Sequence, residues 1–248
     1  MEPPRGYRVV SWARTGEGLD SGRPPHGDHR VIHSWLTNGG VVVGRRAVLL
    51  GVGAVVGLGA VTLPPRPVRR RVEPCAEWGA RPPVERPVSL AREPERILIH
   101  HTATENVADS SREHAHRLAR FFQGLHMDRN DWGDTGQHFT ITRGGVLLEG
   151  RHGSLDALLA GDRMVEGAHA FGQNRNSIGI ENEGTYVDEE PPAVQWNALV
   201  WLCAVICRQY GIPPTEIHGH RDFWDGTVCP GDAFHALLPR LRARVALA

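Results

Sequence analysis

The stretch Ile97-Leu98-Ile99-His100-His101-Thr102-Ala103 predicts a buried strand that ends in two imidazoles. Two later segments, Ile217-His218-Gly219-His220-Arg221-Asp222 and Thr227-Val228-Cys229-Pro230-Gly231, add further imidazoles and a thiol. A borderline-soft ion such as Zn²⁺ binds neutral imidazole nitrogen and thiolate sulfur in tetrahedral geometry. With three protein ligands, a water takes the fourth position and becomes an attacking group. The three segments therefore predict one metal site suited to hydrolysis.

The composition limits the class of protein. The chain has 248 residues, of which 40% are hydrophobic, as expected of a globular protein with one or two domains. Residues 1–74 carry 11 Arg and 5 acidic residues, which leaves 17 basic and 23 acidic residues in the remainder. This mildly acidic body argues against a nucleic-acid-binding protein, which normally has a basic face. The chain contains no lysine, so a catalytic lysine is excluded.

Three successive segments are expected ahead of the domain. Residues 1–40 mix Pro, Gly, Arg and His without an apolar period, and we expect a disordered leader. In residues 41–65, Arg45-Arg46 precede an uncharged, glycine-rich run from Ala47 to Leu63, which resembles a bacterial twin-arginine export signal. Such a signal implies transient contact with the membrane and export machinery, and a secreted or cell-envelope protein; a retained membrane anchor is the alternative. Residues 66–74, which include three consecutive arginines, are expected to be a linker.

Residues 75–248 predict one α/β domain with a mixed central β-sheet flanked by helices. Short apolar runs predict strands, and 3.6-residue periods with capping residues predict helices. The expected strands are 96–100, 138–142, 146–149, 177–183 and 216–218. The expected helices run from Ser110 or Ser111 to about Met127, over Ala193–Tyr210, and onward from about Asp232.

Seven short segments occur in an order that is typical of one superfamily. They are Cys75-Ala-Glu-Trp-Gly-Ala-Arg-Pro-Pro, Ile99-His-His-Thr-Ala, Trp132-Gly-Asp-Thr-Gly-Gln-His-Phe, Gly167-Ala-His-Ala, Ser177-Ile-Gly-Ile-Glu-Asn-Glu-Gly, Gly219-His-Arg and Cys229-Pro-Gly. From about Cys75 to its C-terminus, the chain resembles the peptidoglycan recognition protein and type-2 N-acetylmuramoyl-L-alanine amidase superfamily. The resemblance implies a zinc enzyme that acts on bacterial peptidoglycan. Its reaction would cleave the amide that joins N-acetylmuramic acid to the first L-alanine of the stem peptide.

The resemblance implies a zinc site made by His100, His220 and Cys229. Alternation along a strand directs His101 to the opposite face from His100, so His101 is not expected to be a ligand. His218 precedes His220 by two residues and can share its face on an ideal strand. We expect a hydrogen-bonded structural role for His218. As a fourth ligand it would instead close the site, which would indicate a structural metal protein or a peptidase of different specificity.

The expected catalytic base departs from one pattern of the superfamily. Many members have a Tyr where this chain has Gln137, whose amide does not titrate in the working range. Another branch uses the first Glu of an I-E-x-E-G strand, which is Glu181 here. A carboxylate beside zinc can take a proton from the bound water and pass it to the departing amine. Glu183 is the second candidate, and a salt-bridged role for Glu181 is the alternative.

Further residues are expected around the reacting bond. Thr227 occupies the position that stabilises the oxyanion in the superfamily, although it can instead stabilise its turn, and Gln137 is expected to assist there. His169 matches a position that lines the substrate cleft, and Trp132 and Asn182 are further candidates for substrate contacts.

We therefore expect a zinc-dependent N-acetylmuramoyl-L-alanine amidase. The alternative is a non-catalytic peptidoglycan-binding module on the same fold, which Gln137 favours and the complete ligand set opposes. Cys75 can form a disulfide with Cys203 or Cys207, or all three can be small buried thiols.

Overall fold

In this computed structural model, the described residues are 68 and 71–248. The expected leader (residues 1–40) and the expected signal or anchor (41–65) lie outside the described residues. Among the described residues, no helix has the length and apolar character needed to cross a bilayer.

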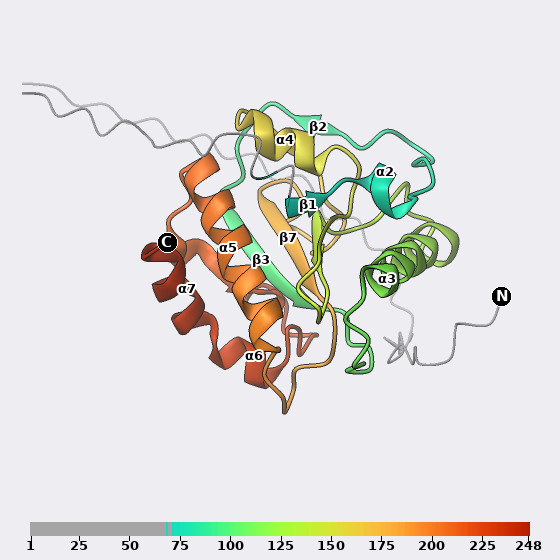
Figure 1. Cartoon of the computed structure of the whole chain (residues 1–248). Helices are drawn as coiled ribbons and strands as arrows, with labels where there is room; N and C mark the ends of the chain where they lie inside the picture. Colours follow the sequence, from blue (N-terminus) through green and yellow to red (C-terminus); the bar gives the residue numbers. More distant parts are fainter. Residues whose placement is uncertain (1–67, 69–70) are drawn as a thin grey trace, which may run out of the picture. The chain divides into compact units, whose positions relative to one another are not determined.

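The centre of the domain is a six-stranded mixed sheet with the strand order β1-β5-β4-β7-β3-β8 (Figure 1). Only β4 and β5 are antiparallel neighbours, and the other neighbouring strands run parallel. A separate pair, β2 (Ser89–Leu90) and β6 (Met164–Val165), is antiparallel. The prediction of a mixed α/β sheet is confirmed. The strands are β1 (Val72–Glu73), β3 (Arg96–His101), β4 (Phe139–Ile141), β5 (Leu147–Glu149), β7 (Ser177–Asn182) and β8 (Ile217–Gly219).

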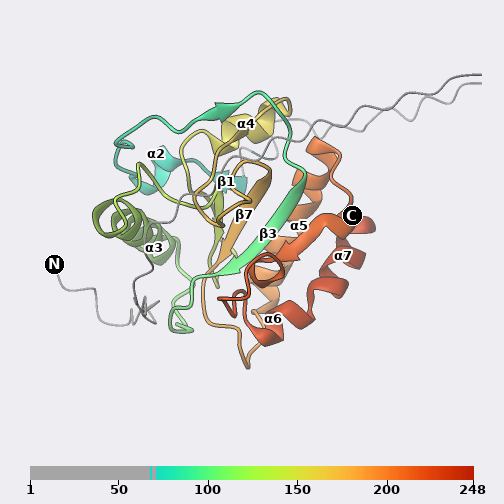
Figure 2. The same ribbon diagram turned by 180° about the vertical axis from the view of Figure 1, so that it is seen from behind.

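Helices pack on both faces of this sheet. Helix α5 (Ala193–Tyr210) and α7 (Leu238–Ala246) share the main hydrophobic core with one face, where Ile97 and Ile99 of β3 are fully buried. Seen from the opposite side, β3 lies in front of α5 (Figure 2). The remaining helices are α2 (Cys75–Trp78), α3 (Arg112–Gly124), α4 (Ser154–Ala160), α6 (Asp232–Ala236), a π-helical turn (Leu125–Arg129) and two 3₁₀ turns (Pro214–Glu216, His220–Asp222).

The second face of the sheet is only partly covered by apolar side chains. Over β5, Leu148 packs in a small cluster with Trp78 of α2 and Ala115 and Ala119 of α3. Farther along the same face, β4, β7 and β3 carry polar side chains. Because strand residues alternate between faces, His100 lies on this second face while Ile99 lies in the main core.

The helix ends follow from local sequence. The Ser111 side chain accepts a hydrogen bond from the backbone N–H of His114 at 3.1 Å and caps α3. Helix α5 begins and ends as expected and is closed by Gly211, whose φ of 66° is left-handed. The expected last helix is divided into α6 and α7, because Pro239 lacks an N–H and occupies the first turn of α7.

One expectation about the N-terminal part of the domain needs correction. The segment 66–74 was expected to be a linker, but β1 within it pairs with β5, and Val68 and Val72 are buried in the main core. Of the two alternatives that the sequence left open for Cys75, Cys203 and Cys207, the structure agrees with buried thiols, since all four cysteines are free and buried. Cys75 packs in the small cluster, whereas Cys203 and Cys207 lie in the main core.

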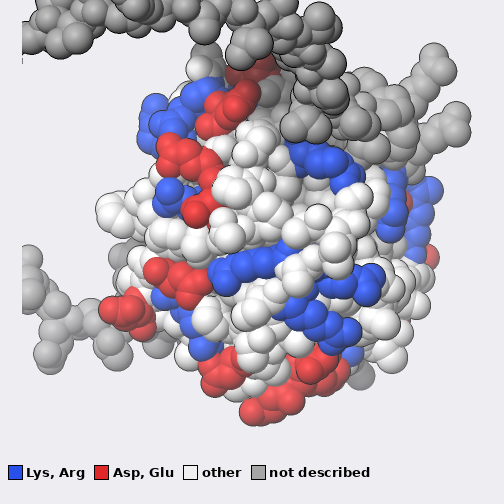
Figure 3. Space-filling model, turned by 90° about the vertical axis from the view of Figure 1, so that its left-hand side faces the viewer, with Lys and Arg blue, Asp and Glu red and all other residues white. Residues whose placement is uncertain are grey.

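The charged side chains on the face shown in Figure 3 are mixed in sign. Arginine and acidic side chains form small patches, several of which lie directly beside one another, and uncharged surface covers the rest of this face. No broad basic surface of the kind that binds nucleic acid is visible on this face.

Candidate metal centre and active site

Three donor side chains converge at the C-terminal end of β3. His100 is near the end of β3, His220 begins the 3₁₀ turn that follows β8, and Cys229 lies in the loop before α6. One ligand atom from each lies within 4.8 Å of the other two. The predicted ligands are therefore brought together, although the chain separates them by up to 129 residues.

The spacing of one donor pair matches a zinc site. His100 Nδ1 lies 3.7 Å from Cys229 Sγ. In a tetrahedral site with bonds of about 2.1 Å to nitrogen and about 2.3 Å to sulfur, these two atoms lie about 3.6 Å apart. His218 is not part of this converging set, and its Nε2 lies 3.3 Å from a carboxylate oxygen of Glu216. With three protein ligands in the described residues, a fourth position stays available to water or substrate.

Burial sets the protonation of the donors. His100 and Cys229 are both only 3% exposed. Burial, reinforced by His169 and His220, lowers the pKa of His100 well below its usual value, which favours the neutral imidazole that binds metal. Burial and the nearby Glu181 raise the pKa of the Cys229 thiol. A bound cation would offset this, because a coordinating thiol is deprotonated.

The loop that presents Cys229 is held by three backbone contacts. The Cys229 N–H donates to Thr227 Oγ1 at 3.0 Å, and the Arg221 N–H donates to the Cys229 carbonyl at 3.0 Å. The His101 N–H points at Cys229 Sγ from 3.4 Å. Thr227 thus stabilises its turn, one of the two roles that the sequence left open.

A row of polar side chains crosses the sheet beside the ligands. Glu181 of β7 pairs in register with His100 of β3 and with Thr140 of β4, so the three side chains project from the same face. Burial raises the pKa of Glu181 to about 8. Among the described residues its carboxylate has no hydrogen bond or ion pair. A desolvated carboxyl without a fixed partner, beside a metal site, has the properties of a proton-transfer group.

Gln137 also reaches this row. Its Nε2 donates to Thr140 Oγ1 at 2.9 Å, and the side chain is only 2% exposed. Gln137 therefore contacts Thr140, the residue paired with Glu181, and its amide does not titrate.

His169 contacts the candidate metal ligand His100. The His169 Nδ1 and His100 Nε2 atoms are 3.0 Å apart, and the rings meet edge to face. The ring sits over Gly179 of β7, where an added Cβ would be 2.5 Å from it. Glycine is needed at this position because any side chain would displace the imidazole.

An aromatic groove opens beside His220. Its volume is ≈ 550 Å³, and it includes the expected residues Trp132 and His169. Sequence reasoning missed Phe171, Phe223 and Trp224, of which Phe171 is wholly exposed and Trp224 about half exposed. The aromatic pair Phe223-Trp224, which follows His220-Arg221-Asp222 in the sequence, could have indicated an aromatic surface beside His220. The lining residues are Trp132, Ala168, His169, Ala170, Phe171, Asn174, His220, Phe223 and Trp224.

Two candidates from the sequence lie outside the site. Asn182 was expected to contact substrate, but it is fully buried and its Nδ2 donates to the His100 carbonyl at 2.9 Å. It follows Glu181 on β7 and therefore projects from the opposite face.

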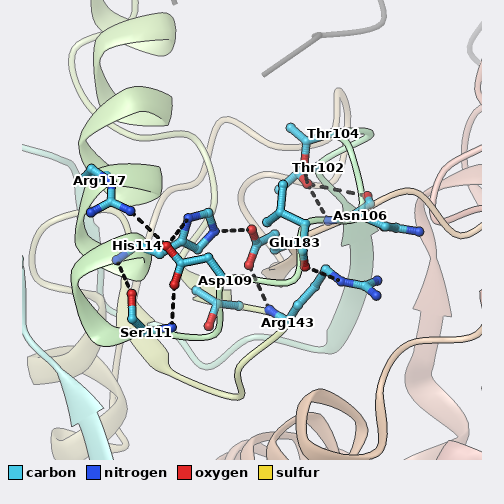
Figure 4. A network of polar contacts seen from close by, with 12 residues as sticks. Thr102, Thr104, Asn106, Asp109, Ser111, His114, Arg117, Arg143 and Glu183 are labelled. Carbon is cyan, nitrogen blue, oxygen red and sulfur yellow. Dashed lines mark hydrogen bonds and ion pairs between the residues drawn. The ribbon is translucent and has the colours of Figure 1, made fainter. Parts of the chain in front are cut away.

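Glu183, the second candidate for the base, belongs to a separate polar network (Figure 4). Its carboxylate contacts His114 Nε2 at 2.5 Å and accepts from the Arg143 N–H at 2.8 Å. These bonds tie α3 and the β4–β5 turn to the end of β7. A carboxylate held in this way supports the fold and is not poised at the metal centre.

Comparisons with known proteins agree with this geometry. A family model described as N-acetylmuramoyl-L-alanine amidase matches residues 90–232. Peptidoglycan-recognition protein SC2 of Drosophila melanogaster is 31% identical over 157 residues, 63% of this chain and 78% of SC2. Peptidoglycan-recognition protein LE of the same organism is 33% identical over 124 residues, 50% of this chain, and the match spans only 32% of LE.

Solved structures share the fold. The peptidoglycan recognition protein LE in complex with tracheal cytotoxin, a monomeric diaminopimelic acid-type peptidoglycan, superposes with a TM-score of 0.60 at 27% identity, covering 69% of this chain and 94% of that one. The N-acetylmuramoyl-L-alanine amidase LysC from Clostridium intestinale, at 23% identity and TM-score 0.54, covers 71% and 97% and shows the fold alone. Since the family model spans more than half of the chain and includes all three donors, the chain belongs to the N-acetylmuramoyl-L-alanine amidase family.

Proposed function

We propose that this protein hydrolyses the amide between N-acetylmuramic acid and L-alanine in bacterial peptidoglycan, with zinc held by His100, His220 and Cys229. The main support for the proposal is the three-donor cluster together with the desolvated, unpaired carboxyl of Glu181 in register beside it. When bound, zinc would polarise the scissile carbonyl and acidify a water.

The chain's own residues would handle the proton. Glu181 projects from the same face as His100 and is desolvated, so its carboxylate is suited to accept a proton from the attacking water. The same group, then protonated, would deliver that proton to the departing amine. Its raised pKa of about 8 makes both the acidic and the basic form accessible near neutral pH.

Two neutral side chains are assigned supporting roles. Thr227 Oγ1 accepts from the Cys229 N–H, so its own O–H is still available to donate to the developing oxyanion. Gln137 is buried and donates to the Thr140 hydroxyl, and its assigned role is to orient the Thr140 hydroxyl next to Glu181. We propose Trp132 and His169, at the groove, as candidate contacts for the glycan or peptide.

This substrate requires export. Peptidoglycan lies outside the cytoplasmic membrane, so the proposal agrees with the interpretation of residues 41–65 as an export signal. The proposed partner is peptidoglycan, and no nucleic acid is expected to bind.

A non-catalytic peptidoglycan-binding protein is the second candidate. Gln137 is the observation that favours it, because no titrating side chain occupies the position where many superfamily members have a Tyr. In this case the groove would bind muramyl peptide without turnover, and Glu181 would have no effect on bound substrate.

Mass analysis of a peptidoglycan digest tests the two candidates. The zinc-loaded wild-type protein should release stem peptides with a free L-alanine amino group. Cys229→Ala should abolish release, and Glu181→Gln should lower it by roughly 10²–10⁴-fold. The exposed Glu190→Gln is the matched control and should retain wild-type release. Full activity in Cys229→Ala would end the amidase proposal, while binding without products in the wild type would establish the recognition protein.

A further inference from the structure

The imidazole of His100 is held between two partners. Its Nδ1 faces Cys229 Sγ at 3.7 Å, and its Nε2 faces His169 Nδ1 at 3.0 Å. The first contact is with a member of the donor cluster, and the second is with a residue outside that cluster.

The direction of the second hydrogen bond follows from the first contact. A neutral imidazole has one N–H donor and one acceptor nitrogen. If Nδ1 gives its lone pair to the metal, the proton is on Nε2, and the His100 N–H donates to His169 Nδ1. His169 must then carry its own proton on Nε2. A hydrogen bond of this kind sets both the tautomer and the ring orientation of a metal ligand.

The surrounding chain holds His169 in place for this contact. The backbone N–H groups of His169 and Ala170 both donate to Asn174 Oδ1, at 2.8 and 2.9 Å. Gly167 and Gly179 leave the space that the ring fills, with added Cβ atoms 2.6 and 2.5 Å from it. A side chain that only reached into a groove would not need a niche of this kind.

His138 closes the other side of the niche. Its ring meets His169 edge to face with centroids 5.4 Å apart. His138 is itself fixed, because Nε2 contacts the Val165 carbonyl at 2.8 Å and Nδ1 accepts from the Gly179 N–H at 3.0 Å. Both ring nitrogens of His138 are therefore engaged elsewhere, and His169 Nδ1 contacts His100 Nε2 at 3.0 Å.

We propose that His169 is a positioning residue of the metal centre, which holds His100 in the tautomer that presents Nδ1 to zinc. This rests on the proposed zinc site. His169 also borders the groove, but a position in the cleft does not by itself imply this role. In the proposed role, His169 acts on the metal through His100.

The zinc affinity of two variants tests the proposal. His169→Asn keeps an acceptor oxygen at the place of Nδ1, since both atoms are bonded to Cγ, whereas His169→Leu has a similar size and no acceptor. We expect His169→Leu to weaken zinc binding by roughly 10–100-fold in competition with a chelator. His169→Asn should restore most of that affinity. A purely structural role would not distinguish the two variants in this order.

A measurement on the wild-type protein covers the case in which the variants do not fold. In the zinc-loaded protein, histidine ¹⁵N–¹H spectra should show His100 protonated on Nε2 and His169 protonated on Nε2. A proton on His169 Nδ1 would overturn the proposal.

The outcomes also separate this inference from the proposed function. If Cys229→Ala binds zinc as tightly as the wild type, the metal site itself is wrong. If Cys229→Ala loses zinc while His169→Leu keeps wild-type affinity and raises only KM, His169 is a substrate contact and the positioning role is refuted.

Discussion

Replacing Glu181 with glutamine should stabilise the metal-free protein at neutral pH while it removes the proposed base. Burial raises the pKa of this carboxyl from 4.5 to about 8, and no partner among the described residues compensates. Below pH 4.5 the Glu181 carboxyl is protonated in both the folded and the unfolded state, so its raised pKa does not lower the stability of the fold there. As pH rises toward 8, only the unfolded state ionises, and stability falls.

The magnitude follows from these two values. Each pH unit between these pKa values is worth about 1.4 kcal/mol, so at pH 7 the desolvated Glu181 carboxyl lowers the free energy of unfolding by about 3 kcal/mol. Glu181→Gln keeps the shape and cannot ionise, so it should regain about 3 kcal/mol at pH 7 and almost nothing near pH 4. Bound zinc should reduce the difference in stability between wild type and Glu181→Gln at pH 7, because a nearby cation favours the ionised carboxylate of the wild type.

Urea unfolding of chelator-treated protein at these two pH values measures the effect. Glu183→Gln is the matched control, two residues farther along the same segment. Its carboxylate is buried and bonded to His114 and to the Arg143 N–H, so its loss should destabilise the protein by about 3 kcal/mol. Equal stability of wild type and Glu181→Gln at pH 7, or an equal gain at both pH values, would refute the reasoning.

Three further results are expected. Gly179→Ala places a methyl group 2.5 Å from the His169 ring and should cost about 1–3 kcal/mol and weaken zinc binding, as read by thermal unfolding and chelator competition; an unchanged Tm would contradict the close approach. The hydrogen bond to Asp134 raises the pKa of His152. Protonated His152 therefore stabilises the fold below about pH 6.5, and this stabilisation is lost as the pH rises through the folded-state pKa. In urea unfolding measured at a series of pH values, His152→Asn should lack this loss of stability. A thiol reductant should leave Tm unchanged, because all four cysteines are free; a lowered Tm would reveal a bridge.

Much of the fold could be predicted because it depends on local patterns. The apolar run before His100 predicted β3 to within one residue, and the periodicity and closing glycine of α5 predicted both of its ends. Strand alternation also predicted that His100 and His101 project to opposite faces. The expected linker was wrong at β1, because two residues carry too short a pattern to indicate pairing with a strand far along the chain.

The site was predictable only in its ligands. Imidazole and thiolate are metal donors, so residue type indicated three donor-bearing segments, and the family resemblance then implied His100, His220 and Cys229 within them. Asn182 was misplaced because a motif does not state which face each residue occupies. The groove residues Phe171 and Trp224 were missed because exposed aromatic side chains form no periodic pattern in the sequence.

The sequence by itself therefore determined the donor set, the mixed α/β class and the replacement of a titrating tyrosine by Gln137. Tertiary structure alone decided that Glu181 lies beside His100, that Glu183 supports the fold, and that His169 contacts His100. The reason is physical: these relations join residues on different strands and loops, and they depend on strand register and on the space that glycines leave. Neither is visible in the order of residues along one strand.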